Sequence, residues 1–148
     1  MIEHAREGNV HVVTLGDDAN LINPAFVARL HEVLDAVEAA SDGASGLVLT
    51  ARGKFFSNGL DVAELMQLPP DAMKQFNRDL VRAFGRLVTL PVPSVAAVNG
   101  HAFAGGAVLA TGLAIVIEVI LVALLALAAA LIVSDLVKRI GFIPVPPR

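Results

Sequence analysis

The chain has 148 residues, the length of one domain that can bury a substantial core. Its formal net charge of −3 argues against a nucleic-acid binder, which needs a basic surface, so we expect no nucleic-acid partner. The absence of cysteine excludes disulfides, thiolate chemistry and cysteine-ligated zinc. Hydrophobic residues make up 55% of the chain, and residues 102–133 contain a single charged residue, Glu118.

The first fifty residues predict two strands with a helix between them. Residues 10–15 are short and β-branched, which predicts a strand. Asn23 and Pro24 supply a side-chain cap and a first-turn proline for an amphipathic helix over residues 24–40. Residues 46–50 form an apolar run too short for a helix, which predicts a parallel strand buried on both faces.

The next fifty residues repeat this pattern. Leu68-Pro69-Pro70 interrupts the chain, and the apolar spacing beyond it predicts a second amphipathic helix over roughly residues 71–88. Residues 94–98 predict a third buried strand. Strands that alternate with helices indicate an α/β fold with parallel pairing.

Two glycine-containing segments follow directly after apolar runs that predict buried strands. Residues 54–61 read Lys-Phe-Phe-Ser-Asn-Gly-Leu-Asp, and residues 99–106 read Asn-Gly-His-Ala-Phe-Ala-Gly-Gly. Glycine permits backbone geometry that brings amides close to a ligand. We expect Gly59 to allow a turn that presents the N–H of Leu60, and Gly105 to open a helix whose first amides lack partners. Two such amides, fixed in advance, can stabilise an oxyanion.

Together the two segments resemble the paired signature of the crotonase family, the enoyl-CoA hydratases and isomerases. The intervening helix, Pro91-x-Pro93 and the strand that ends in Val98-Asn99-Gly100 strengthen the resemblance, which covers residues 8 to about 110. It implies a crotonase-like ββα spiral core, here truncated and followed by a hydrophobic helical segment. It also implies an enzyme that stabilises a thioester enolate.

The resemblance also implies which residues form the active site. It implies that the backbone N–H groups of Leu60 and Gly105 form the oxyanion hole for an acyl-CoA thioester. It further implies that the groove for the coenzyme A thioester is lined by Ala19, Ser57, Asn58, Gly59, Leu60, Asp61 and Gly105, with Ala19 and Asn20 on the opposite wall. No cofactor is implied beyond the coenzyme A of the substrate. A cytoplasmic location follows from the same resemblance, and the histidine spacing gives no support to a metal site.

A position shortly after the double glycine bears on which reaction is expected. In the hydratases of the family a glutamate lies on the first turn of the helix, whereas the matching position here is Val108. This difference argues against hydration by two carboxylates and favours double-bond isomerisation, in which a single later carboxylate moves a proton. The amino-acid sequences of both segments are most similar to the Δ3-Δ2-enoyl-CoA isomerase branch.

The family pattern stops after Ala110. The acidic segment that would supply the later catalytic carboxylate has no equivalent in this chain, so activity is expected to be low or absent. The later segments that normally mediate a family-like homotrimer are also missing, which makes a trimer doubtful here. We therefore expect a partial crotonase-like domain over residues 1–111, an apolar segment over 112–135 and a short polar, proline-rich end over 136–148.

Residues 113–133 are long and apolar enough to span a bilayer. Three interpretations of this segment stay open. It is a tail that arose by frameshift, truncation or fusion, a membrane anchor, or a buried structural element, since residues 115–122 are rich in β-branched side chains. Under the first two, the chain is a truncated or membrane-tethered fragment without catalytic activity.

Overall fold

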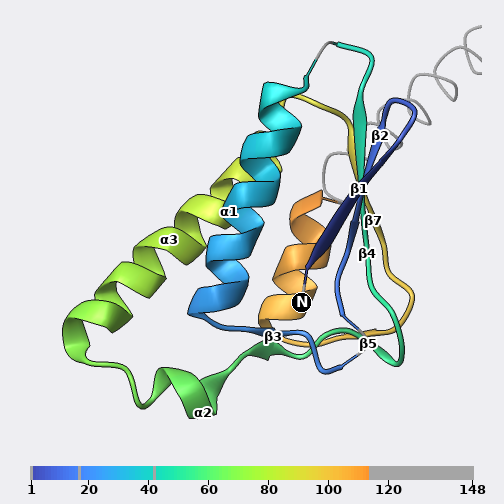
Figure 1. Cartoon of the computed structure of the whole chain (residues 1–148). Coiled ribbons are helices and arrows are strands. Elements are labelled where there is room, and N and C mark those ends of the chain that lie inside the picture. The colour runs from blue at the N-terminus through green and yellow to red at the C-terminus, as the bar shows by residue number, and fades with distance from the viewer. Residues whose placement is uncertain (1, 17, 42, 114–148) are drawn as a thin grey trace, which may run out of the picture. The chain divides into compact units, whose positions relative to one another are not determined.

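The computed structural model describes residues 2–16, 18–41 and 43–113. The chain divides into two units, Met1–Val116 and Ile117–Arg148, and the described residues all lie in the first. A further helical stretch covers residues 105–113, coloured orange in Figure 1. The other elements, in chain order, are β1 (Glu3–Glu7), β2 (Val10–Thr14), β3 (Leu21–Ile22), α1 (Pro24–Ala39), β4 (Gly46–Thr50), β5 (Phe55–Ser57), β6 (Gly59–Leu60), α2 (Val62–Leu65), α3 (Pro70–Val88), β7 (Ser94–Ala97) and β8 (His101–Ala102).

The main sheet has the strand order β1-β2-β4-β7. Strands β2, β4 and β7 are parallel, as the alternation of strands and helices predicts. Strand β1 was not predicted, and it pairs with β2 in the antiparallel direction. The two strands join through Gly8 and Asn9, and Gly8 has a positive φ of 60° that suits such a tight turn.

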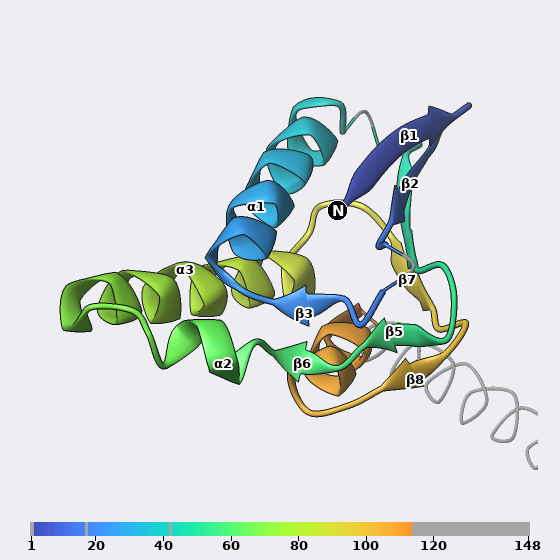
Figure 2. The same cartoon turned by 60° about the horizontal axis from the view of Figure 1, so that its bottom comes forward.

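Helices α1 and α3 lie on the same side of this sheet (Figures 1 and 2). Helix α1 begins as predicted, because the side chain of Asn23 accepts a hydrogen bond from the N–H of Phe26 and Pro24 occupies the first turn. Its apolar stripe is buried in the core and consists of Val27, Leu30, Val33, Leu34 and Val37. Helices α1 and α3 and strands β2, β4 and β7 all match their predicted ranges to within one residue.

The expectation that residues 94–98 form a fully buried strand is wrong. Ser94 is buried in β7, but Val95 is 40% exposed and Ala97 is exposed. Side chains alternate between the two faces of a sheet, so Val95 and Ala97 share the face on which the neighbouring Val48 is only half-buried, and among the described residues this face is less covered than the other. Strand β4, expected to be buried on both faces, instead alternates between buried and half-buried residues.

The described part of the chain, residues 2–16, 18–41 and 43–113, contains no helix that is long and apolar enough to cross a membrane. The predicted apolar segment over residues 113–133 lies outside the described residues except for Leu113, which is buried. The predicted division at residues 111–112, the hydrophobic helical segment and its membrane association therefore stay predictions.

The two glycine-containing segments interlock through their backbones. Strand β5 pairs with β8, the N–H of His101 donates to the carbonyl of Lys54 at 3.0 Å, and the N–H of Phe103 donates to the carbonyl of Ser57 at 2.9 Å. A Cβ atom on Gly100 would lie 2.3 Å from the Lys54 oxygen, and one on Gly106 would lie 2.2 Å from the Ser57 oxygen. Both contacts are closer than any side chain permits, so these two positions require glycine.

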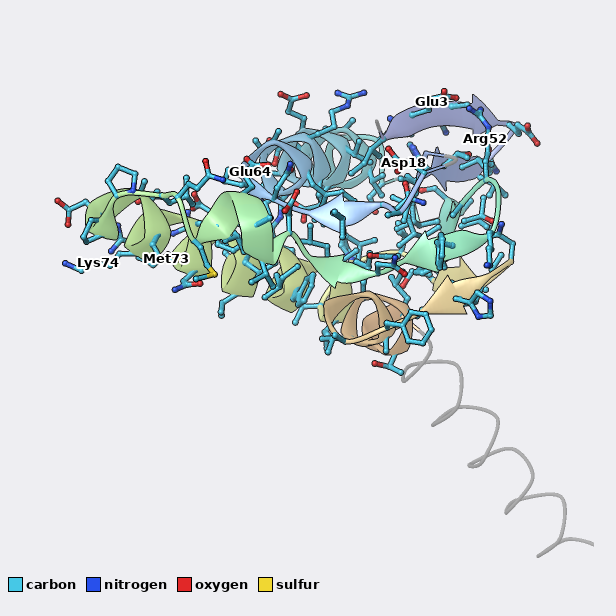
Figure 3. All side chains as sticks on the ribbon, turned by 90° about the horizontal axis from the view of Figure 1, so that it is seen from below. Glu3, Asp18, Arg52, Glu64, Met73 and Lys74 are labelled. Carbon is cyan, nitrogen blue, oxygen red and sulfur yellow. The ribbon has the colours of Figure 1, made fainter. Side chains whose placement is uncertain are left out.

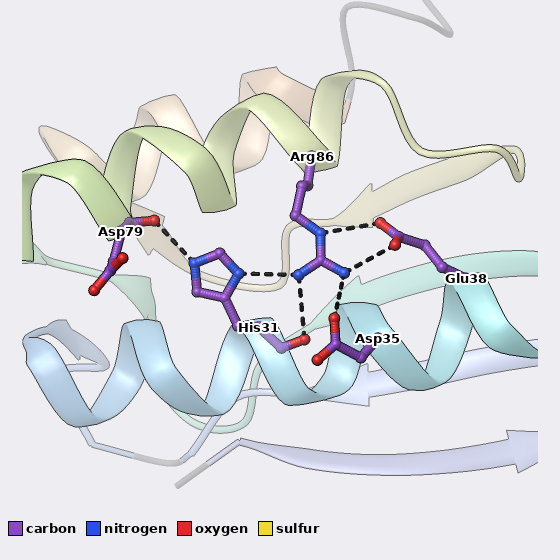
Figure 4. Close-up of polar contacts among 5 residues, drawn as sticks. All are labelled: His31, Asp35, Glu38, Asp79 and Arg86. Atoms are coloured by element: carbon purple, nitrogen blue, oxygen red, sulfur yellow. Dashed lines mark hydrogen bonds and ion pairs between the residues drawn. The ribbon is translucent and has the colours of Figure 1, made fainter.

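Arg86 ties α3 to α1 (Figure 4). Its guanidinium donates to Asp35 at 2.7 Å and to Glu38 at 3.0 Å, and it reaches Nδ1 of His31 at 3.0 Å. Because the backbone oxygen of Asp79 can only accept, Nε2 of His31 carries the hydrogen and Nδ1 accepts from Arg86. Hydrogen bonding to Glu38, and then to Asp35, raises the pKa of Arg86 and keeps it charged.

We predict that Arg86→Ala lowers the free energy of unfolding by about 1.5–3 kcal/mol, because it removes charge-assisted hydrogen bonds from a largely buried side chain. Urea denaturation at neutral pH measures the effect. Lys74→Ala is the matched control, since it removes a highly exposed pair with Asp71, and it should change stability by less than about 0.5 kcal/mol. Equal effects of the two substitutions would show that Arg86 does not hold the helices together.

A second prediction concerns the glycines. Gly106→Ala should lower the free energy of unfolding by about 4–5 kcal/mol, which is near the upper end for single substitutions. The reason is that the new Cβ meets backbone that cannot move away. Gly85→Ala, in α3, places its new Cβ where no other atom lies within 4 Å, and it should instead stabilise by about 0.5–1 kcal/mol. Thermal denaturation compares the two, and a stable Gly106→Ala protein would contradict the observed interlock.

Candidate oxyanion site

The N–H of Leu60 faces away from the strand next to it. Strand β3 pairs in parallel with β6, and the N–H of Asp61 donates to the carbonyl of Ile22 at 3.0 Å. Successive peptide groups of an extended strand point in opposite directions, so the N–H of Leu60 points to the side opposite β3. The turn that precedes it needs glycine, because Gly59 has a φ of +85°.

Gly105 begins the helical stretch over residues 105–113. The hydrogen bonds of its first turn run from Gly106 to Phe103 at 2.7 Å and from Val108 to Ala104 at 3.1 Å. Ala104 sits in the left-handed region at a φ of 46° and turns the chain into the helix. An N–H at the first helical position has no acceptor within the helix, and the positive end of the helix dipole lies there.

The fold brings these two amides together. A Cβ atom on Gly59 would lie 2.9 Å from the nitrogen of Gly105, and a Cβ on Gly105 would lie 3.7 Å from the nitrogen of Leu60. Gly105 is half-buried and Leu60 is 39% exposed, so solvent reaches the region. Two amides separated by more than forty residues in the sequence thus lie side by side near the surface.

Ser57 and Asn58, two of the predicted substrate-binding residues, form hydrogen bonds that hold residues 57–59 against residues 19–20. Ser57 is fully buried, and its Oγ donates to the carbonyl of Asn20 at 2.6 Å while it accepts from the N–H of Gly59 at 3.1 Å. The N–H of Asn58 donates to the carbonyl of Ala19 at 2.9 Å. The Asn58 side-chain oxygen is buried and has no partner. The backbone of residues 19–20 therefore touches residues 57–58 directly.

A cavity of about 430 Å³ lies beside this region and includes three of the residues predicted to line the groove, Ala19, Asn20 and Asp61. Arg29 also lines it, although nothing in the sequence pattern singled this residue out. The Nε of Arg29 donates to the carbonyl of Ile2 at 3.3 Å, and both residues face the cavity. The remaining lining residues are Gly16, Asp18, Leu21, Asn23, Ala25 and Phe26.

Two carboxylates adjoin the predicted hole in sequence, and both accept hydrogen bonds from the protein. Asp61 caps α2, since its carboxylate accepts from the N–H of Glu64 at 3.0 Å. The carboxylate of Glu64, labelled in Figure 3, accepts from the side chain of Asn23 at 2.7 Å and so links α2 to the start of α1. Val108 lies on the first turn of the helix that begins at Gly105 and is 53% exposed. The first turn thus offers an apolar side chain where a carboxylate would provide acid or base chemistry.

Within residues 2–16, 18–41 and 43–113, no group of three or more histidine, aspartate or glutamate side chains could hold a metal ion. The carboxylates next to the two amides are engaged with the protein itself. The feature that remains for catalysis among the described residues is the backbone itself, where the amides of Leu60 and Gly105 lie close together.

Comparison with known proteins identifies the family of this chain. The sequence model of the enoyl-CoA hydratase/isomerase family matches residues 5–123. An Arabidopsis thaliana protein named peroxisomal enoyl-CoA delta isomerase 2 is 37% identical over 112 residues, which cover 71% of this chain and 46% of the relative. A Thermus thermophilus protein with a provisional enoyl-CoA hydratase name is 43% identical over 109 residues, 70% of this chain and 43% of the relative.

Solved structures agree with the fold. A crystal structure of an enoyl-CoA hydratase from Bacillus anthracis superposes with a TM-score of 0.66 at 23% identity, covering 75% of this chain and 44% of that chain. The chain spans less than half the length of the relatives that it matches. The predicted crotonase-like α/β core is therefore confirmed, and the chain belongs to the enoyl-CoA hydratase/isomerase family.

Proposed function

We propose that this chain binds acyl-CoA thioesters and that the N–H groups of Leu60 and Gly105 together hold the thioester oxygen. The observation that carries the proposal is the adjacency of the two amides, since the Gly105 nitrogen lies only 2.9 Å from where a Cβ on Gly59 would stand. A glycine at position 59 leaves this space free. Paired, preorganised donors of this kind contribute most when negative charge develops on an oxygen, as it does when a thioester forms its enolate.

We further propose that part of the coenzyme A moiety occupies the cavity lined by Ala19, Asp61 and Arg29. The cavity lies next to the amide pair, because its lining residue Asp61 directly follows Leu60 in the sequence. Arg29 supplies a cation on one wall, which suits a ligand that carries phosphate groups. Ser57 would then support the binding surface through its Oγ, which accepts from the N–H of Gly59, and Asn58 through its N–H, which donates to Ala19.

The reaction that we propose is enoyl-CoA double-bond isomerisation. Support comes from the Arabidopsis thaliana relatives that are named as enoyl-CoA delta isomerases and from the apolar Val108. Asp61 and Glu64 are occupied in capping and in the contact to Asn23, so neither is placed to move a proton freely. Turnover by this chain should consequently be slow even where binding is intact.

A pair of matched ligands tests the role of the amides. Octanoyl-CoA carries the thioester carbonyl, whereas the thioether octyl-CoA has the same chain length without it. We predict that calorimetric titration finds octanoyl-CoA bound about tenfold more tightly, since two hydrogen bonds of about 0.5–1.5 kcal/mol each are lost in the thioether. Equal dissociation constants would refute the role of the amides, and no binding of either ligand would refute acyl-CoA binding altogether.

Val108 offers a test of the reaction. Val108→Glu places a carboxylate on the first turn beside the amide pair, and general acid–base catalysis typically contributes about 10²–10⁴-fold in rate. We predict that this variant hydrates a 2-enoyl-CoA about 10²-fold faster than Val108→Gln, which has nearly the same size and no charge. Loss of the conjugated enoyl absorbance measures the rate. Equal rates in the two variants, with thioester binding retained, would place Val108 away from the reacting carbons.

A further inference from the structure

The sequence contains two Asn-Gly dipeptides, Asn58-Gly59 and Asn99-Gly100, one in each of the interlocked glycine-containing segments. In such a dipeptide the backbone nitrogen of glycine can attack the side-chain amide of the preceding asparagine, because glycine has no side chain that blocks the approach. The fold places the two dipeptides in opposite surroundings, so their reactivity should differ.

Asn99 lies in the loop that joins β7 to β8, and it is exposed to solvent. Its Nδ2 donates one long hydrogen bond, to the carbonyl of Gly53 at 3.3 Å. The N–H of Gly100 donates to no acceptor among the described residues. Neither the side chain that is attacked nor the nitrogen that attacks it is therefore held by a strong hydrogen bond.

The dipeptide Asn58-Gly59 is held on both sides. The N–H of Asn58 donates to the carbonyl of Ala19 at 2.9 Å, and the N–H of Gly59 donates to Oγ of Ser57 at 3.1 Å. Gly59 is buried, and the side-chain oxygen of Asn58 is buried as well. Attack by the Gly59 nitrogen therefore requires this part of the fold to open first.

The reaction at Asn99 needs no reagent except water. The nitrogen of Gly100 bonds to Cγ of Asn99 and closes a succinimide ring, the bond from Cγ to Nδ2 breaks, and the proton of the Gly100 amide leaves with Nδ2 as ammonia. Water then opens the ring at either carbonyl. Opening at Cγ yields aspartate, whereas opening at the backbone carbonyl yields isoaspartate, in which the main chain runs through the former side chain.

Isoaspartate at position 99 would disturb the contact that Gly100 makes. A Cβ on Gly100 would lie 2.3 Å from the oxygen of Lys54 and 3.2 Å from the nitrogen of Phe55, so its α-carbon packs directly against that peptide group. The N–H of His101 donates to the same oxygen at 3.0 Å, where β5 and β8 run side by side (Figure 2). Extra main-chain length immediately before Gly100 is incompatible with this fit.

We propose that Asn99 is a site of spontaneous deamidation, that isoaspartate formed there separates the two glycine-containing segments, and that the fold protects Asn58 from the same reaction. The modification thereby loosens the backbone contact that brings the amides of Leu60 and Gly105 close together. This inference is independent of the proposed thioester binding, because it depends only on the two dipeptides and their contacts.

Peptide mass spectrometry of the full chain, incubated at neutral pH, tests the site. In the folded protein Asn99 should deamidate at least about tenfold faster than Asn58, because reaction at Asn58 waits for local opening. In urea both dipeptides lose their surroundings and should react at similar rates, which provides the control. Equal rates at the two positions in the folded protein, or no reaction at Asn99 while the unfolded chain reacts, would overturn the proposal.

Hydrogen exchange of the incubated protein tests the consequence. The fraction that carries isoaspartate, separated on an anion exchanger by its additional carboxylate, should lose amide protection at His101 and Phe103, whose N–H groups donate to Lys54 and Ser57. Residues 70–88 serve as the internal reference, and the unmodified fraction is the control. Protection at His101 and Phe103 that is equal in the two fractions would overturn the separation of the segments.

The variant Asn99→Gln supplies a further comparison, because its longer side chain closes the corresponding ring far more slowly. After the same incubation this variant should keep the protection that the wild-type protein loses. An equal loss in both proteins would show that the change does not arise at Asn99. The comparison of wild-type fractions remains decisive where the variant does not fold.

Discussion

The arrangement of the site depends on the close approach of two backbone segments. Residues 100–106 lie so near residues 54–59 that Gly100 and Gly106 have no room for a Cβ, which would meet carbonyl oxygens at 2.3 and 2.2 Å. Hydrogen bonds from His101 and Phe103 fix the register of this contact. Because the constraint lies in the backbone, it brings the amides of Leu60 and Gly105 close together regardless of the surrounding side chains.

Much of this core could be predicted from the sequence, because the relevant signals are local. Asn23 and Pro24 begin α1 as expected, and the apolar spacing that predicts the helix selects the residues that are buried. The glycine positions also carried information, since Gly59 does adopt a positive φ and a helix does begin at Gly105. Their spatial adjacency followed from the family resemblance and not from any local pattern, because no periodicity relates residues so distant in sequence.

The parts that could not be predicted depend on tertiary context. Strand β1 is charged and short and gives no apolar alternation, yet its pairing with β2 fits the two-residue Gly8-Asn9 turn, a signal that was available in the sequence. The exposure of Val95 depends on which face of β7 the rest of the fold covers, since Val95 lies on the same face as the half-buried Val48. Likewise, Arg29 lines a cavity because α1 lies beside Ile2, which precedes β1. The Oγ of Ser57 is engaged in a hydrogen bond to the carbonyl of Asn20, which the motif alone does not reveal.

The convergence of the two glycine segments is the central claim, and proton NMR of the folded chain tests it most directly. The Gly105 nitrogen would lie 2.9 Å from a Cβ placed on Gly59, so the Gly105 amide proton should show a strong nuclear Overhauser effect to a Gly59 α-proton. Observation of that cross-peak would confirm that the two glycine segments meet at this point. Its absence, in a sample whose helices α1 and α3 are intact, would contradict the account.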